Sequence, residues 1–156
     1  MRILAFDPGY ERLGVAVLEK ENGKEILLHS ACIQTSAKLD FPTRLSELGA
    51  ATLHLIKEWS PNGVALEKVF FTNNSKTAMQ IAEVRGMLIY LAATHQLTIH
   101  QYTPNEVKVA VTGSGRADKT AIALMVPKLV AISRGKRLDD ELDAIAVGIT
   151  CLASVR

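Results

Sequence analysis

The sequence predicts an α/β domain in which a mixed five-stranded sheet is flanked by helices. Strand-like segments open the chain, strand and helix patterns then alternate, and helical patterns close it. The chain has 156 residues, 48% of them apolar, which is enough to build one substantial core. It contains no linker-like, repetitive or low-complexity stretch. We therefore expect residues 1–156 to form a single domain.

Three strands are expected near the N-terminus. Residues Arg2–Asp7 are mostly apolar and are typical of a buried strand. The segment Asp7-Pro8-Gly9-Tyr10 has the composition of a tight turn. Residues 13–18 are therefore predicted to return from this turn as a second strand, and residues 24–35 to form a third.

Helix and strand patterns alternate in the middle of the chain. From Pro42 to Trp59, apolar residues recur at three- and four-residue spacing, as in an amphipathic helix. The segment Ser60-Pro61-Asn62-Gly63 ends that helix. The elements predicted next are a strand at 63–67, a long helix at 74–95 and a strand at 97–102.

Three helices are predicted in the last third of the chain. Pro104 opens the first, because proline fits the first turn of a helix. A loop rich in Gly and Ser, residues 112–116, separates it from a second helix at 119–130. The third is predicted over residues 139–153, so the order is βββαβαβ followed by helices.

Composition limits where the protein works and which sites it carries. No apolar stretch reaches the 18 or so residues of a membrane span, and Asp7 follows the N-terminus too closely for a signal peptide. We expect a cytoplasmic protein with no membrane partner. Cys32 and Cys151 are far apart and have no zinc-site spacing. Both are predicted to be buried, reduced thiols.

Basic residues gather in one part of the chain although the net charge is only +2. From Lys108 to Arg137 there are seven Lys and Arg residues, and Asp118 is the one acid. A solvated surface is the ordinary explanation for such a run. Beside a cluster of acids, however, the run indicates a protein that follows a polyanionic backbone.

Four carboxylates occupy places where they can meet. Asp7 and Glu67 each end an apolar strand, and ligands of α/β sheets collect beyond strand ends. Asp140 and Asp143 are three apart and share one side of the last helix. Four converging acids must protonate or bind a divalent cation, which implies phosphodiester chemistry. The structural alternatives are a turn role for Asp7 and a capping or dipole role for Asp139, Asp140 and Glu141 in the first turn of the helix, and spacing leaves Asp139 open in place of Asp140.

Short motifs in one order over nearly the whole chain resemble those of the RuvC-type Holliday junction resolvases. The motifs are Asp7-Pro8-Gly9 with Gly14, Glu67-Lys68-Val69-Phe70 with Asn73 and Asn74, Arg85-Gly86, Val107-Lys108 with Thr112-Gly113, Ala117-Asp118-Lys119, and Asp140-x-x-Asp143-Ala144-x-Ala146. The resemblance implies a ribonuclease H-like fold and a homodimer that cuts four-way DNA junctions symmetrically during recombination and repair.

The resemblance also assigns roles in the chemistry. It selects Asp140 over Asp139 and nominates Asp7, Glu67, Asp140 and Asp143 as metal ligands. Hard carboxylate oxygens suit Mg²⁺, and Mn²⁺ is expected to substitute. We expect two ions per active site, with in-line hydrolysis that leaves 5′-phosphate and 3′-hydroxyl ends.

Further residues are expected to contact DNA. Lys108 and Lys119 match family positions close to the catalytic centre, where a lysine can contact phosphate or offset developing charge. Phe70 matches a family aromatic associated with unstacked bases, and Phe71 competes for that role. The other expected DNA contacts are Asn73, Asn74, Lys76 and Arg116. A branch-migration motor is a possible partner.

Three rival functions stay open. An ATP-handling domain of the actin and sugar-kinase type also begins with a strand, an Asp and a Gly turn, but it normally needs a second lobe. A ribonuclease H-like nuclease of the YqgF type would act on RNA. A junction-binding protein without catalysis would not need the complete set of acids.

Overall fold

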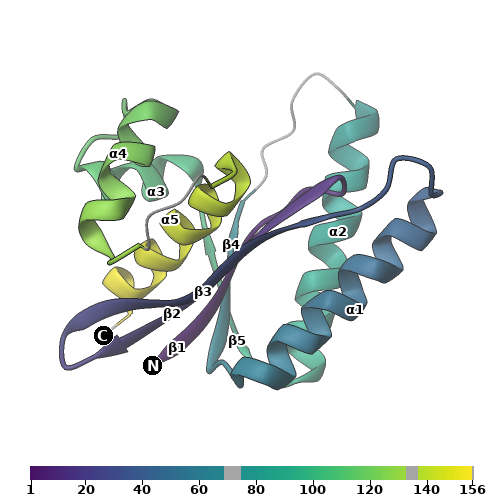
Figure 1. The fold of residues 1–156 in the computed structure, drawn as a ribbon, viewed down its shortest axis with the longest axis horizontal. Helices are drawn as coiled ribbons and strands as arrows, with labels where there is room; N and C mark the ends of the chain where they lie inside the picture. Colours follow the sequence, from purple (N-terminus) through teal and green to yellow (C-terminus); the bar gives the residue numbers. More distant parts are fainter. Residues whose placement is uncertain (69–74, 133–136, 156) are drawn as a thin grey trace.

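The computed structural model describes residues 1–68, 75–132 and 137–155, and the side chains of residues 75 and 76 are outside the description. It confirms the predicted order of strands and helices (Figure 1). The elements are β1 Arg2–Asp7, β2 Arg12–Glu21, β3 Lys24–Gln34, α1 Phe41–Trp59, β4 Gly63–Glu67, α2 Ser75–Thr94, β5 Thr98–Tyr102, α3 Pro104–Thr112, α4 Lys119–Leu129 and α5 Asp139–Ser154.

The sheet is mixed and has five strands, as expected, and their order in the sheet is β3-β2-β1-β4-β5. The three N-terminal strands pair antiparallel, whereas β1, β4 and β5 run parallel to one another. Phe6 of β1 pairs with Leu66 of β4. The next residues, Asp7 and Glu67, therefore lie side by side at the carboxyl edge of the parallel strands.

Helices cover both faces of the sheet (Figure 1). One layer is α1 and α2, which pack on Leu4 and Phe6 of β1. The other layer is α3, α4 and α5, which pack on Ile3 and Ala5. Because successive residues of a strand point to opposite faces, Asp7 belongs to the same face as Ala5 and so to the α5 layer.

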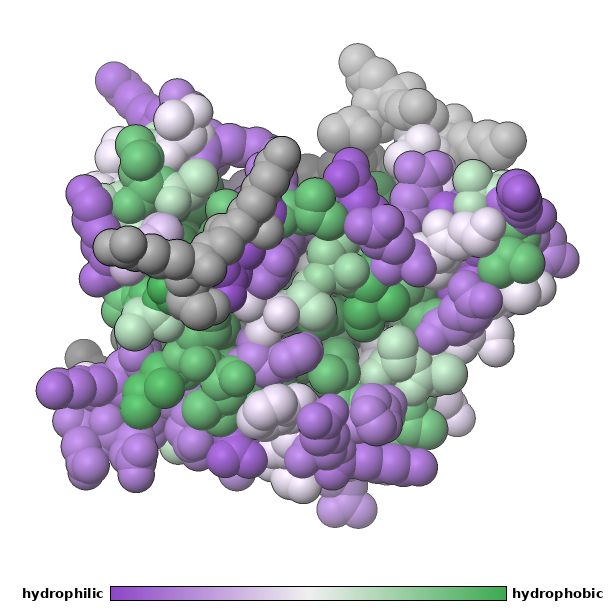
Figure 2. Space-filling model, viewed as in Figure 1, coloured by the Kyte–Doolittle hydropathy of each residue, from purple (hydrophilic) through white to green (hydrophobic). Residues whose placement is uncertain are grey.

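The edge strand β3 lies between the two helical layers. Figure 2 shows apolar and weakly polar side chains along this middle strip, with hydrophilic side chains gathered around the rim. Ile26 of β3 is 40% exposed. Cys32, also on β3, is half-buried rather than buried as predicted, because an edge strand is covered on fewer sides.

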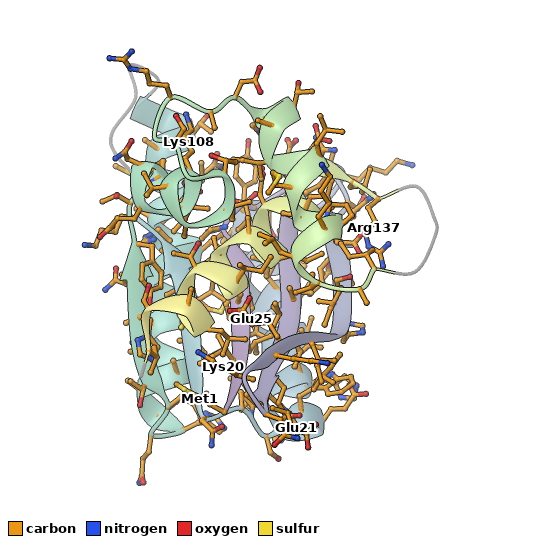
Figure 3. All side chains as sticks on the ribbon, turned by 90° about the vertical axis from the view of Figure 1, so that its left-hand side faces the viewer. Met1, Lys20, Glu21, Glu25, Lys108 and Arg137 are labelled. Carbon is orange, nitrogen blue, oxygen red and sulfur yellow. The ribbon has the colours of Figure 1, made fainter. Side chains whose placement is uncertain are left out.

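The hairpin between β2 and β3 is longer than predicted. Residues 13–18 were expected for the second strand, but β2 continues to Glu21. Asn22 and Gly23 make the two-residue turn with φ values of 51° and 77°, which asparagine and glycine tolerate best. The polar residues at the end of β2 carry a tertiary contact, since Nζ of Lys20 donates to the carbonyl of Leu152 in α5 at 2.9 Å. Figure 3 shows Lys20 beside this end of the helix.

Local capping fixes the helices that flank the site. Thr103 and Glu106 form a reciprocal capping box at the start of α3, and Gly113 ends that helix with φ of 77°. The carboxylate of Asp118 accepts a hydrogen bond from the amide of Ala121 and begins α4. Lys119 is therefore the first residue of a capped helix.

Candidate active site

Three of the four predicted acids line one pocket at the carboxyl edge of the sheet. Asp7 comes from β1, Glu67 from β4 and Asp143 from α5. The remaining residues that line this pocket are Val107, Lys119, Ile122 and Val147. The apolar members belong to the α3, α4 and α5 layer, so the carboxylates stand against an apolar wall with one cation beside them.

Gly14 allows α5 to approach these strands. It pairs with Asp7 in the β1–β2 register. A Cβ atom at residue 14 would overlap the backbone carbonyl oxygen of Asp140 and would come within 3.2 Å of Cβ of Asp7. The first turn of α5 therefore lies directly on β2, which explains how Asp140 and Asp143 reach the end of β1.

A polar network fixes the same turn of α5 against the edge strand. Oε1 of Glu141 accepts a 2.6 Å hydrogen bond from Oγ of Ser30 on β3. The same oxygen lies 2.9 Å from Nε of Arg137, and both side chains of this ion pair are largely buried. Arg137 is labelled on the right of Figure 3. The first turn of the helix that carries Asp140 and Asp143 is thus bonded to β3 as well as packed on β2.

Asp7 is the most strongly perturbed acid of the pocket. Burial raises its pKa, and the charges of Asp143, Glu67 and Asp140 raise it further, to about 7, while Lys119 acts in the opposite direction. Burial also raises the pKa values of Glu67 and Asp143. The surroundings therefore favour a bound proton or a cation at this place.

Lys119 supplies the nearest positive charge. Its Nζ lies 3.3 Å from Oδ2 of Asp143, and this ion pair raises the pKa of Lys119. The lysine side chain is 79% exposed, so its ammonium group stays accessible to a ligand. Lys108 lies on α3, and its charge lowers the pKa of Glu67. Figure 3 shows Lys108 and Met1 at opposite ends of the molecule. β1 starts beside Met1, so it ends on the side where Lys108 lies. Both lysines therefore lie near the acids, as the resemblance led us to expect.

Arg85 is a site residue whose role the sequence did not reveal. Its Nη1 donates to the backbone carbonyl of Glu67, and its Nη2 donates to Oε1 of Gln101 at 2.7 Å. The guanidinium group ties α2 to the ends of β4 and β5. Arg85-Gly86 was one of the matching motifs, but no local pattern indicates that this arginine positions Glu67.

Asp140 stands apart from the other three acids. It lines an adjoining pocket with Arg12, whose Nε lies 3.5 Å from Oδ2 of Asp140. The other residues of that pocket are Gly9, Tyr10, Glu11, Thr77 and Ile81. Over the described ranges, no three His, Cys, Asp or Glu side chains are gathered closely enough to hold a metal ion together. The structure thus places three of the four predicted carboxylates in one pocket and Asp140 beside it, near enough for its charge to raise the pKa of Asp7, and the set of four metal ligands stays a prediction.

The chemistry of the residues nevertheless fits a divalent cation. The donors are carboxylate oxygens, which are the hard ligands that Mg²⁺ and Mn²⁺ prefer. Burial and like charges hold the pKa of Asp7 far above its ordinary value, and a cation would reverse this effect. Oδ2 of Asp140 is buried and has no hydrogen-bond partner among the described residues. Such an oxygen is available to a ligand.

Most of the expected DNA contacts lie outside the described residues, and Arg116 lies outside the pocket of the three acids. Phe70, Asn73 and Asn74 lie outside the described residues, as does Phe71. Lys76 belongs to α2, but its side chain is also outside the description. The structure places Arg116 on the exposed loop between α3 and α4, where its backbone amide donates to Oγ of Ser114. Arg116 does not line the pocket of the three acids.

Two further features concern the thiols and the lengths of the helices. Cys32 and Cys151 are both free thiols. Within the described parts of the chain, the helices are too short or too polar to cross a membrane.

Comparisons with known proteins give one consistent result. The family model of the crossover junction endodeoxyribonuclease RuvC matches residues 3–151. A crossover junction endodeoxyribonuclease RuvC from Caldicellulosiruptor saccharolyticus is 40% identical over 155 residues, which are 99% of this chain and 93% of that relative. The protein of the same name from Alkaliphilus metalliredigens is 38% identical over 149 residues, or 96% and 91% of the two chains. A solved structure of Thermus thermophilus RuvC in complex with Holliday junction substrate matches with a TM-score of 0.89 and 29% identity, covering 96% of this chain and 92% of that one.

Proposed function

The chain belongs to the RuvC family of crossover junction endodeoxyribonucleases, and we propose that it resolves four-way DNA junctions by metal-dependent hydrolysis of phosphodiester bonds. Its fold is the ribonuclease H-like fold of RuvC structures. The observation that carries the proposal is the pocket in which Asp7, Glu67 and Asp143 meet Lys119. Acids and a lysine in this arrangement suit a phosphate group together with the cations that activate it.

The metal ligands in this proposal are Asp7, Glu67 and Asp143, with Asp140 completing the set. We propose two Mg²⁺ ions per active site, with Mn²⁺ as a substitute. When bound, the ions supply an activated water and stabilise the leaving 3′ oxygen of the cleaved strand. Because the 3′ oxygen would be the leaving group, in-line attack of water on phosphorus would leave a 5′-phosphate and a 3′-hydroxyl.

The chain's own residues orient the phosphate and balance charge. Lys119 holds Asp143 at 3.3 Å, and its exposed ammonium group is placed to contact a phosphate oxygen as well. Lys108 offsets the charge of Glu67 from the α3 side. Arg85 holds the end of β4 through the carbonyl of Glu67, so the carboxylate projects from a fixed backbone. These contacts support catalytic roles for both lysines and a positioning role for Arg85.

The proposed DNA surface extends beyond the pocket. Arg116 and Lys76 would contact the sugar-phosphate backbone, because exposed cations add sequence-independent affinity. Phe70 would stack on an unpaired base, with Asn73 and Asn74 beside it in the sequence. The support for Phe70 is the family motif, since residues 69–74 lie outside the description.

We propose that the protein acts as a homodimer. A four-way junction offers two equivalent strands, and two sites related by a twofold axis would cut both. Four exposed residues follow one line along α2 at three- and four-residue spacing: Met79, Glu83, Gly86 and Tyr90. Met79 and Tyr90 are each 66% exposed, which is high for large apolar side chains. This line of residues is the proposed contact between protomers.

The cellular role follows from the substrate. Resolution of four-way junctions belongs to homologous recombination and repair, and we propose action in the cytoplasm. Coupling to a branch-migration motor is part of the proposal, although no surface of the described residues identifies its docking site.

The test is cleavage of a synthetic mobile four-way junction with Mg²⁺ or Mn²⁺, beside linear duplex, forked DNA and structured RNA. We expect paired symmetric nicks in the junction alone, and loss of at least about a thousandfold in rate for Asp7→Asn, since the variant lacks a carboxylate ligand. Cleavage confined to RNA would move the assignment to a YqgF-type nuclease. Binding of the junction without cleavage would leave a recognition protein.

A further inference from the structure

Among the described residues, Arg12 makes the ion pair with Asp140. It lies at the start of β2, directly after the bend at residues 10 and 11. Its Nε is 3.5 Å from Oδ2 of Asp140. The contact spans 128 positions of the chain, so it exists only because the first turn of α5 lies on β2. Arg12 was given no role from the sequence.

Asp140, which Arg12 contacts, lines a different pocket from the other three acids. Asp140 and Arg12 line one pocket, while Asp7, Glu67 and Asp143 line the next. Asp140 is nevertheless near enough for its negative charge to raise the pKa of Asp7. An arginine beside Asp140 reduces the repulsion among four neighbouring carboxylates.

The pair is suited to exchange rather than to permanent structure. The side chain of Arg12 is 54% exposed, so its guanidinium group can turn into solvent, whereas the side chain of Asp140 is 25% exposed and its Oδ2 is buried. At 3.5 Å the two atoms make an ion pair without a hydrogen bond, and Oδ2 of Asp140 has no hydrogen-bond partner among the described residues. A stronger cation would therefore displace the guanidinium group at small cost.

We infer that Arg12 is a positioning residue that competes with the divalent cation for Asp140. It holds the carboxylate beside the pocket while the site lacks metal, and it releases the carboxylate when Mg²⁺ or Mn²⁺ binds. The inference rests on the proposed function, because it requires Asp140 to be a metal ligand. It adds that the metal affinity of this chain is set partly by a residue that is not a ligand.

The experiment measures Mn²⁺ binding to the metal-stripped protein without DNA, by the electron paramagnetic resonance signal of free Mn²⁺ at low salt. We expect Arg12→Gln to bind Mn²⁺ about three- to tenfold more tightly, since Asp140 then has no competing cation. Arg12→Lys keeps the charge and should stay within about twofold of the parent. In junction cleavage, the Mg²⁺ concentration for half-maximal rate should fall by the same factor in Arg12→Gln.

Two controls separate this effect from general electrostatics. Lys57→Gln removes one exposed charge from the last turn of α1, at the other end of the sheet, and should leave Mn²⁺ affinity within about twofold. Asp140→Asn should weaken Mn²⁺ binding, and Arg12→Gln should then have no further effect in that background.

Each outcome tests the inference about Arg12 separately from the assignment of the protein as a nuclease. An equal gain from Arg12→Gln with and without Asp140 would overturn the inference and leave the nuclease assignment intact. No gain, or weaker Mn²⁺ binding, would overturn it in the same way. If Asp140→Asn binds Mn²⁺ like the parent, Asp140 is not a ligand, so the inference fails together with that part of the proposed metal site, while junction cleavage still tests the enzyme.

Discussion

Asp7 is an acid whose surroundings in the folded protein favour its neutral form. Burial and the charges of Asp143, Glu67 and Asp140 raise its pKa to about 7 from an ordinary value of 3.8. Between these two values the unfolded chain has already released a proton that the folded chain still binds. The free energy of unfolding of the metal-free protein therefore falls as pH rises through this window, and the loss is complete above about pH 7.

Replacing the carboxyl group tests this dependence. We predict that Asp7→Asn raises the free energy of unfolding of the metal-free protein, little near pH 4 and fully above about pH 7. Since one pKa unit corresponds to about 1.4 kcal/mol, the gain at high pH should be on the order of 2–4 kcal/mol. Urea unfolding in EDTA at several pH values measures it.

The matched control is Glu47→Gln, which neutralises an exposed acid on α1. This variant should change the free energy of unfolding by less than about 0.5 kcal/mol at every pH. Adding Mg²⁺ should reverse the order of the parent and Asp7→Asn, because the cation binds the intact set of acids. A gain for Asp7→Asn that does not vary with pH would contradict the assigned cause.

At this scale the sequence predicted the acids better than their neighbours. Asp7 and Glu67 follow apolar strands, and the positions of Asp140 and Asp143 follow from helical spacing, so local pattern suffices. The partners that position them do not follow from local pattern. The contact of Arg12 with Asp140 depends on how α5 lies on the sheet. Sequence spacing also gives no side-chain direction, so it did not separate Asp140 from the other three acids.

At the scale of elements, the site depends on how closely α5 lies on β1 and β2. Gly14 leaves room for the backbone of Asp140, and Gly148 leaves room for Leu18 and Ala5. The two contacts differ in kind. At Gly14 an added Cβ would meet backbone, which cannot move alone, whereas at Gly148 it would meet the end of a flexible leucine side chain.

This difference predicts that Gly14→Ala destabilises the protein more than Gly148→Ala does. Gly14→Ala should lower the free energy of unfolding by at least about 2 kcal/mol and should displace Asp140 and Asp143 from Asp7. Gly148→Ala should cost about 1 kcal/mol or less, because alanine favours the helix while Leu18 adjusts. Urea unfolding and junction cleavage together measure both effects.

Gly49→Ala is the control, since its Cβ would sit 3.6 Å from Sδ of Met87 in ordinary contact. It should raise the free energy of unfolding by about 0.5–1 kcal/mol, as expected for alanine in the middle of a helix. Equal losses in free energy of unfolding for Gly14→Ala and Gly148→Ala would contradict the prediction that α5 packs most closely against the sheet at Gly14.

The elements themselves were largely predictable because their signals are local. Pro104 and Gly113 bound α3, and Asp118 begins α4 through its side chain. The end of β2 was missed because Glu19-Lys20-Glu21 is polar and resembles a loop. Those residues pair with β3, Glu19 also pairs with Arg2 of β1, and Lys20 contacts α5. A contact of this kind is invisible in a strand's own composition.

At the scale of the whole molecule, paired cleavage requires two active sites in a fixed relation. The proposed contact is the exposed line on α2, where Met79 and Tyr90 are three helical turns apart. Gly86 lies between them on the same line, and an added Cβ there would meet nothing within 4 Å among the described residues outside its own helix turn. A small residue at this place lets a second helix approach closely. The pocket of the three acids lies on the opposite face of the sheet, so the contact leaves it open.

A charge on this line should separate the protomers. We predict that Tyr90→Glu sediments as a monomer at micromolar concentration, because the twofold axis brings the two new carboxylates together. The monomer should nick one strand of a four-way junction where the parent nicks two. Sedimentation velocity and the ratio of paired to single nicks measure the two effects.

Leu124→Glu provides the matched comparison, because Leu124 of α4 is 63% exposed and lies in the other helical layer. It should remain a dimer and cut in pairs. If both substitutions dissociate the protein, exposed charge rather than the α2 line controls assembly. If the parent itself is a monomer that still nicks both strands symmetrically, the junction must bring two chains together, and the twofold relation would then come from the DNA rather than from the protein.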